Sequence, residues 1–148
     1  MLQLLKNPVI NFILQFLLSI LLMIIITEMP SLLDELQPDS SSYINFQSYR
    51  KSIYPLILDL QNSTGLNIIL LQKFIFSYSV VFLIFTLINK GITPFISLVF
   101  FTLLIINIYY VSYTKTILPE ALFFSSINFF SAFILKKESV FKYIILGF

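Results

Sequence analysis

The chain has 148 residues, of which 58% are hydrophobic and 11% are charged, and its formal net charge is +2. Soluble globular proteins carry about 25% charged residues, so this composition excludes an ordinary soluble globule and predicts an all-α, polytopic membrane protein. The small net charge and the scattered basic residues exclude a nucleic-acid-binding role.

Four stretches are apolar over the length of about 20 helical residues that a bilayer core requires. They cover residues 8–27, 66–88, 94–113 and 118–135, and a fifth apolar stretch covers residues 140–148. We therefore expect four full transmembrane helices and a truncated fifth, which make residues 1–148 a single membrane domain. The first stretch follows Lys6 as a signal peptide would, but its apolar core is too long and no small-residue cleavage site follows it, which favours a retained helix.

The first and second stretches are separated by a loop, residues 28–65, that carries five of the seven acidic residues. Its sequence predicts one or two helical turns over residues 30–36, a helix that starts at Asp39 or Ser40 and includes Tyr49, and a helix with Pro55 in its first turn. These segments combine apolar side chains with tyrosines. We therefore expect the loop to lie on the membrane surface.

The basic residues indicate the orientation, because short cytoplasmic loops are enriched in Lys and Arg. A cytoplasmic N-terminus puts five lysines on the inner side and four basic residues toward the outside: Lys6, Lys90, Lys136, Lys137 and Lys142 against Arg50, Lys51, Lys73 and Lys115. The loop, and every acidic residue except Glu138, then lies on the outer side.

Three motifs follow one another along the chain: Pro38-Asp39-Ser40-Ser41-Ser42-Tyr43-Ile44, Arg50-Lys51-Ser52-Ile53-Tyr54-Pro55-Leu56, and Thr116-Ile117-Leu118-Pro119-Glu120-Ala121. Together they resemble the N-terminal part of GT-C-type, polyprenyl-phosphate-dependent membrane glycosyltransferases, the superfamily of protein mannosyltransferase-like and aminoarabinose transferase-like enzymes. In that superfamily an Asp opens the first outer loop, and an Arg-x-x-x-Tyr-Pro-Leu stretch leads into the second span. Pro119-Glu120 stands where Thr-Glu is usual.

The resemblance implies that the chain is the N-terminal part of a larger transferase in a bacterial inner membrane, with the rest of that enzyme as its partner. The implied reaction moves a sugar from a polyprenyl-phosphate donor to a lipid, glycan or protein acceptor on the outer face, with inversion.

With no histidine and no cysteine in the chain, catalysis has to use carboxylates. Asp39 is the candidate base, and Arg50, Lys51 and Lys115 are candidates for holding the leaving phosphate. The secondary acidic candidates are Asp34, Glu35 and Glu120. If a metal takes part, carboxylate ligands suit Mg²⁺ or Mn²⁺.

Most of these residues also have a purely structural interpretation. Asp39 can cap a helix, and Glu120 can interact favourably with a helix dipole. Asp34 and Glu35 are adjacent, so they point in different directions on a helix and read more simply as solvated loop carboxylates. Lys73 can extend to the headgroups, and Arg50 and Lys51 can contact lipid phosphates.

Two other functions fit the same sequence. The first is a non-enzymatic membrane component, such as a transporter subunit or an accessory protein, for which ionisable groups inside the spans would be expected. The second is an inactive, truncated transferase.

Overall fold

The computed structural model describes residues 7–34, 36–45 and 53–136, and every regular element in these residues is a helix. The all-helical prediction is therefore confirmed. The elements are α1 (Pro8–Glu28), α2 (Ser40–Ile44), α3 (Ile53–Thr64), α4 (Ile68–Asn89), α5 (Pro94–Ile106), α6 (Ile108–Tyr113) and α7 (Glu120–Lys136).

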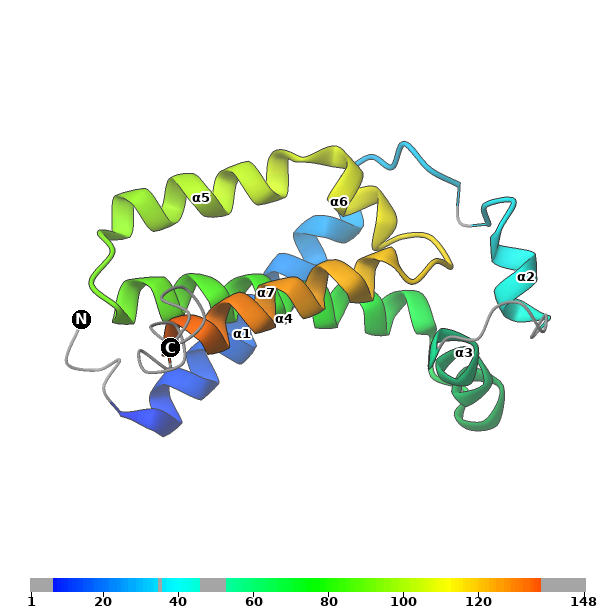
Figure 1. Cartoon of the computed structure of the whole chain (residues 1–148), viewed down its shortest axis with the longest axis horizontal. Helices are drawn as coiled ribbons and strands as arrows, with labels where there is room; N and C mark the ends of the chain where they lie inside the picture. Colours follow the sequence, from blue (N-terminus) through cyan, green and yellow to red (C-terminus); the bar gives the residue numbers. More distant parts are fainter. Residues whose placement is uncertain (1–6, 35, 46–52, 137–148) are drawn as a thin grey trace, which may run out of the picture.

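The long helix α4 is the centre of the fold, and α1, α5 and α7 pack against it (Figure 1). Helices α4 and α7 run in the same direction, whereas α3 lies across them and is seen almost along its axis. Helices α2 and α3 and the start of α7 lie at one end of the molecule, which we call the head. The ends of α4 and α7, with Lys90 and Lys136, lie at the opposite end.

Side chains just ahead of the long helices fix where these helices begin. Asn7, Asn67 and Thr93 each accept a hydrogen bond from a backbone N–H in the first turn of α1, α4 and α5. Proline also lies in the first turn of α1 and α5, where its missing N–H costs nothing. Helix starts at these positions therefore follow from local sequence.

Gly91 allows the tight turn between α4 and α5, since its φ of +88° is a conformation that other residues rarely adopt. A Cβ added there would meet nothing within 4 Å, so an alanine would be strained only in its backbone. We expect Gly91→Ala to lower the free energy of unfolding by about 1–2 kcal/mol, and Gly91→Asn by less. Denaturant titration in detergent micelles measures both values, and an alanine variant as stable as the wild type would contradict the strained turn.

The prediction of four full spans and a truncated fifth is wrong for the described residues. Only α1, with 21 residues, and α4, with 22, are long and apolar enough there to cross a membrane. The third predicted span is interrupted at Asn107, where ψ is 94° and the side chain accepts a hydrogen bond from the N–H of Tyr109, so α5 ends and α6 begins. The fourth is a helix of 17 residues, and residues 140–148 lie outside the described part.

The loop 28–65 is partly helical, as expected. The prediction of helical turns over residues 30–36 is wrong for the described residues there, which are irregular, and α2 is a helix of only five residues. Tyr49 lies outside the described part. Pro55 lies in the first turn of α3, as predicted.

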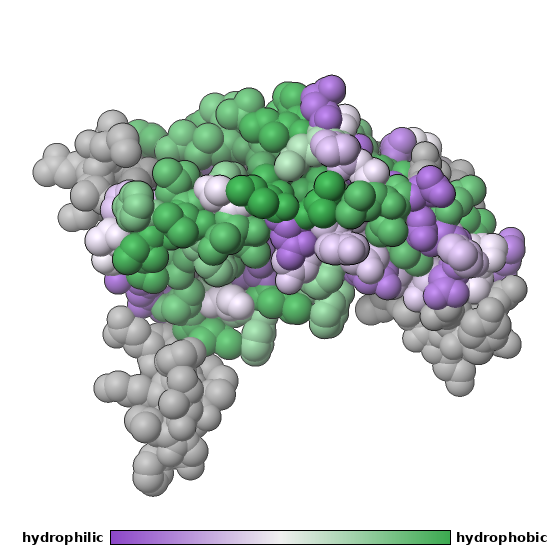
Figure 2. Space-filling model, turned by 90° about the horizontal axis from the view of Figure 1, so that it is seen from above, coloured by the Kyte–Doolittle hydropathy of each residue, from purple (hydrophilic) through white to green (hydrophobic). Residues whose placement is uncertain are grey.

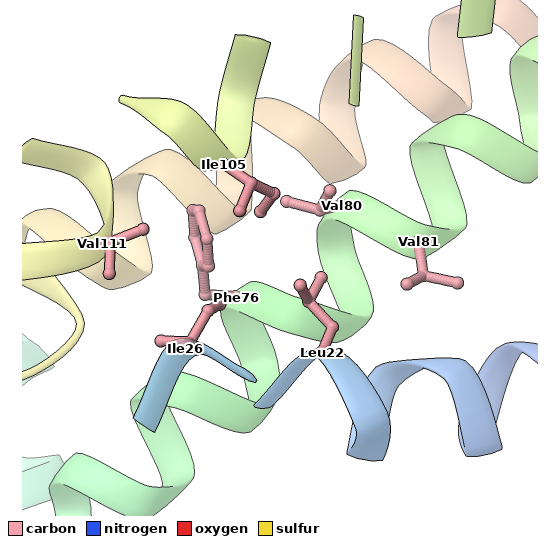
Figure 3. Packing of buried hydrophobic residues seen from close by; sticks show 7 residues of the cluster. All are labelled: Leu22, Ile26, Phe76, Val80, Val81, Ile105 and Val111. Carbon is pink, nitrogen blue, oxygen red and sulfur yellow. The ribbon is translucent and has the colours of Figure 1, made fainter. Parts of the chain in front are cut away.

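Apolar side chains from four helices make the central core (Figure 3). Phe76 and Val80 of α4 lie in its middle, 2% and 0% exposed, and the other members are Leu22, Ile26, Val81, Ile105 and Val111. Much of the remaining apolar surface faces outward on α1, α5 and α7. Figure 2 shows this hydrophobic surface over the middle of the molecule and more hydrophilic residues toward the head.

Candidate functional site at the head

A second apolar core holds the head together. It is formed by Tyr43, Tyr54, Leu58, Ile68 and Leu118, which come from α2, α3, α4 and the segment before α7. The rings of Tyr43 and Tyr54 meet edge to face with centroids 5.4 Å apart, a favourable arrangement for two aromatic side chains. This core fixes α3 against the start of α4.

Three long-range hydrogen bonds join α6 and the segment between α6 and α7 to distant parts of the chain. The N–H of Leu32 donates to Ser112 Oγ at 2.9 Å, and Ser40 Oγ donates to the carbonyl of Ile117 at 2.9 Å. Gln72 of α4 donates from its Nε2 to the carbonyl of Leu118, which lies just before α7, at 2.8 Å. Ser40 and Gln72 are both fully buried, so these bonds are shielded from water.

The described parts of the three sequence motifs meet in the head, although the third lies 59 residues beyond the second in the chain. Ser40 and Tyr43 come from the first motif, Tyr54 from the second and Leu118 from the third. The hydrogen bonds and the tyrosine pair described above join all three. Asp39, at the N-cap position of α2, directly precedes Ser40, which is bonded to the segment that leads into α7.

Asp39 is exposed, and its side chain makes no capping hydrogen bond to α2. The capping interpretation of this residue therefore has no support in the structure. Its backbone carbonyl accepts a hydrogen bond from Ser42 Oγ at 2.7 Å, which fixes the backbone around it. An exposed carboxylate on a fixed turn can reach a substrate from solvent.

Three polar side chains form a cluster of buried oxygen atoms where α3, α4 and the start of α7 come together. The Tyr54 hydroxyl, Gln72 Oε1 and Glu120 Oε2 are all inaccessible, and none has a hydrogen-bond partner among the described residues. Burial raises the pKa of Tyr54, the Gln72 side chain partly opposes that rise, and electrostatic interactions with Glu120 and with the Tyr43 phenol group add to it. The Tyr54 hydroxyl therefore stays protonated and available as a donor.

Lys115 is in the segment between α6 and α7, and its side chain contacts the C-terminal end of α1. Its Nζ donates to the carbonyls of Thr27, at 3.0 Å, and of Met29, which are left unpaired where α1 ends. Burial and the nearby Lys73 ammonium lower its pKa, and Glu28 partly offsets them. In this structure its ammonium group is thus engaged with backbone rather than pointing freely into solution.

We expect Lys115→Met to lower the free energy of unfolding by about 1–2 kcal/mol, because two carbonyls lose a partly exposed, charged donor.

The effect of Lys115→Met on the free energy of unfolding should depend on pH. The unfolded chain keeps Lys115 at its ordinary pKa of 10.5 and so binds the proton more tightly than the folded protein does. Lys115 therefore makes the wild type gain stability as the pH rises from the lowered pKa toward 10.5. The variant should lack this gain in denaturant titrations over the same pH range, and an equal gain would contradict it.

The other predicted site residues are dispersed or lie outside the described part. Asp34 is exposed in the irregular segment after α1, and Glu120 is half-buried in the first turn of α7. Arg50, Lys51 and Glu35 lie outside the described residues. Lys73 is half-buried on α4, near Lys115.

Sequence reasoning gave no site role to Gln72 or Tyr54. An amide in an otherwise apolar helix is a usable signal, because burial of an unpaired amide is costly and such a group needs a partner. The sequence does not identify the group to which the Gln72 amide forms its hydrogen bond.

The head thus has two chemically different parts. One is the exposed carboxylate of Asp39, and the other is the buried oxygen cluster of Tyr54, Gln72 and Glu120. No three acidic, histidine or cysteine side chains gather closely enough to hold a metal ion in the part of the chain that the structure describes. A scan of known protein families, a search of curated proteins and a search of solved structures each found no match to this chain.

Proposed function

We propose that the chain belongs to a membrane glycosyltransferase that takes a sugar from a polyprenyl-phosphate donor at the outer face of a bacterial inner membrane. The observation that carries the proposal is the meeting of the three motifs in the head, described above. Residues that share one catalytic site have to come together in space, and the third motif is separated from the second by 59 residues of largely apolar chain.

The distribution of surface residues supports placement in a membrane. Large apolar side chains of α1 and α5 face outward, including Val9, Phe12, Phe95 and Leu103, each more than half exposed. In water such contiguous apolar surface would be costly, whereas lipid matches it. All the described acidic residues lie in the head or next to it, and Lys90 and Lys136 lie at the opposite end, which agrees with a cytoplasmic N-terminus.

The orientation of α3 supports a reaction at the membrane surface. Since α3 lies across α4, it would run along the surface if α4 crosses the bilayer (Figure 1). Its outward side carries both Leu56 and Asp59, as a helix between lipid and water requires. Asp39 would then face a lipid-borne donor at the level of the headgroups.

In this proposal Asp39 accepts the proton of the acceptor hydroxyl as that oxygen attacks the anomeric carbon, and the bond to the phosphate breaks on the opposite side. A single displacement of this kind inverts the configuration. Arg50 and Lys51, which directly precede α3, are the proposed contacts of the leaving polyprenyl phosphate.

A transfer assay tests this proposal. The protein is reconstituted in liposomes of bacterial phospholipids and supplied with polyprenyl-phosphate donors that carry a radiolabelled hexose or pentose. We expect protein-dependent release of polyprenyl phosphate. Absence of release with every donor, from protein that resists alkaline carbonate extraction, would reject the transferase and keep the membrane placement. Extraction of the protein into the aqueous phase would reject the membrane placement itself.

A further inference from the structure

A cavity of about 440 Å³ lies between α5 and α7, with α4 as its floor. We call it the α5–α7 cavity. Most of its lining is apolar and includes Phe76, Leu83, Leu87, Phe100, Leu104 and Phe124, and Ser97, Asn128 and Ser131 are polar members. Ile96, Phe100 and Ile127 border it and are also 57%, 40% and 46% exposed, so the cavity opens onto the outward apolar surface.

The dimensions of the cavity suit one hydrocarbon chain. Its lining extends along α4 from Phe76 to Leu87, which corresponds to about 16 Å at 1.5 Å per residue. A hydrocarbon chain laid along α4 would contact this apolar lining over that length.

One polar group at the edge of the cavity lacks a partner. Ser97 is 1% exposed, and its Oγ has no hydrogen-bond partner in the described structure. Ser19 of α1 and Ser125 of α7 instead donate to the carbonyl four residues earlier, at 2.6 and 2.7 Å. The buried Ser77 of α4 also lacks a partner among the described residues, but it does not line this cavity. A hydroxyl without an acceptor in an apolar setting costs free energy, which a ligand oxygen would recover.

The place of Ser97 indicates which oxygen that is. Ser97 lies one turn after α5 begins at Pro94, at the end of the bundle that carries Lys90 and Lys136. If α4 spans the bilayer, this end meets the boundary between headgroups and hydrocarbon. The ester carbonyls of glycerolipids lie at this boundary, and the chain that each carries extends into the hydrocarbon.

We propose that the α5–α7 cavity binds one acyl chain of a glycerolipid and that Ser97 donates a hydrogen bond to the ester carbonyl of that chain. The Ser97 hydroxyl would have to turn toward the cavity for this bond, and rotamer changes of this kind are common on binding. The proposal rests on the membrane placement and is independent of glycosyl transfer.

Ser97 also borders a second cavity, of about 370 Å³, between α1, α4 and α5. Substitutions can distinguish lipid binding in the α5–α7 cavity from lipid binding in the second cavity. Ser131 lines only the α5–α7 cavity, and Leu98 lines only the second. Thr102 of α5 provides a matched hydroxyl, because it is exposed and donates to the carbonyl of Leu98 at 2.9 Å.

The test is the retention of lipid by the full chain through purification in mild detergent, followed by native mass spectrometry. We expect one glycerolipid per protein, strongly depleted in Ser131→Phe and reduced about 2- to 10-fold in Ser97→Ala, as for the loss of one hydrogen bond. Thr102→Val and Leu98→Phe should retain lipid as the wild type does. A bound polyprenyl lipid, or depletion in Leu98→Phe but not in Ser131→Phe, would overturn the proposal.

A second measurement uses only the wild-type chain and so does not depend on the folding of variants. Delipidated protein is titrated with an ester-linked glycerolipid and with its ether-linked analogue, which lacks the carbonyl. The ester lipid should bind about 2- to 10-fold more tightly. Equal affinities would overturn the role of Ser97, and failure of both lipids to bind would overturn the site.

Discussion

Asp39→Asn is expected to lower the rate of sugar transfer by about 100- to 10,000-fold, the usual contribution of a general base. Asparagine keeps the size of the side chain but does not accept the proton of the acceptor hydroxyl. Asp39 is exposed, so asparagine fits in its place without steric conflict. Initial rates of polyprenyl phosphate release from reconstituted protein, together with unchanged circular dichroism, measure the effect.

Two matched variants define what the result means. Asp59 is an exposed carboxylate on α3, and Asp59→Asn should transfer sugar at the wild-type rate. Glu120→Gln keeps the buried oxygen cluster in place while it removes the charge, so it tests the other acidic candidate of the head. Near-normal turnover of Asp39→Asn combined with loss of activity in Glu120→Gln would move the base to Glu120.

The helical class and several helix boundaries could be predicted because the signals are local. A capping Asn or Thr, or a proline in the first turn, acts within four residues, and the starts of α1, α4 and α5 lie within two residues of prediction. The third span was predicted wrongly because Asn107 is a single polar residue in an apolar run. Its side chain binds the backbone two residues later and so competes with the helix, which a count of apolar residues does not detect.

For the candidate site in the head, the sequence predicted the types of residue and the chain segments, but not how they are arranged in space. The sequence indicated Asp39 and the three motifs, but the choice of partners depends on tertiary packing. Lys115 illustrates this: its charge suggested a phosphate contact, whereas its Nζ binds carbonyls at the end of α1, more than 80 residues away in the chain. The oxygen cluster of Tyr54, Gln72 and Glu120 likewise joins three helices that only the fold brings together.

Phe76→Ala should have the largest effect on stability, a loss of about 3–5 kcal/mol in the free energy of unfolding. Phe76 is 2% exposed and lies where α4 meets α1 and α5, in one cluster with Ile26, Val80 and Ile105 (Figure 3). Truncation removes its contacts with all of them. The residue also borders the α5–α7 cavity, so the space that it leaves would enlarge an existing cavity instead of closing. Denaturant titration in detergent micelles, followed by circular dichroism, gives the difference.

Phe95→Ala is the matched control, since it removes the same atoms from a ring that is 74% exposed on α5. Its loss should stay below about 1 kcal/mol, because a ring that faces the surroundings in both states gains little on folding. The difference between the two variants isolates what burial in the core contributes, separately from the intrinsic helix propensity of alanine. Equal effects would mean that α4 is not the centre of the fold.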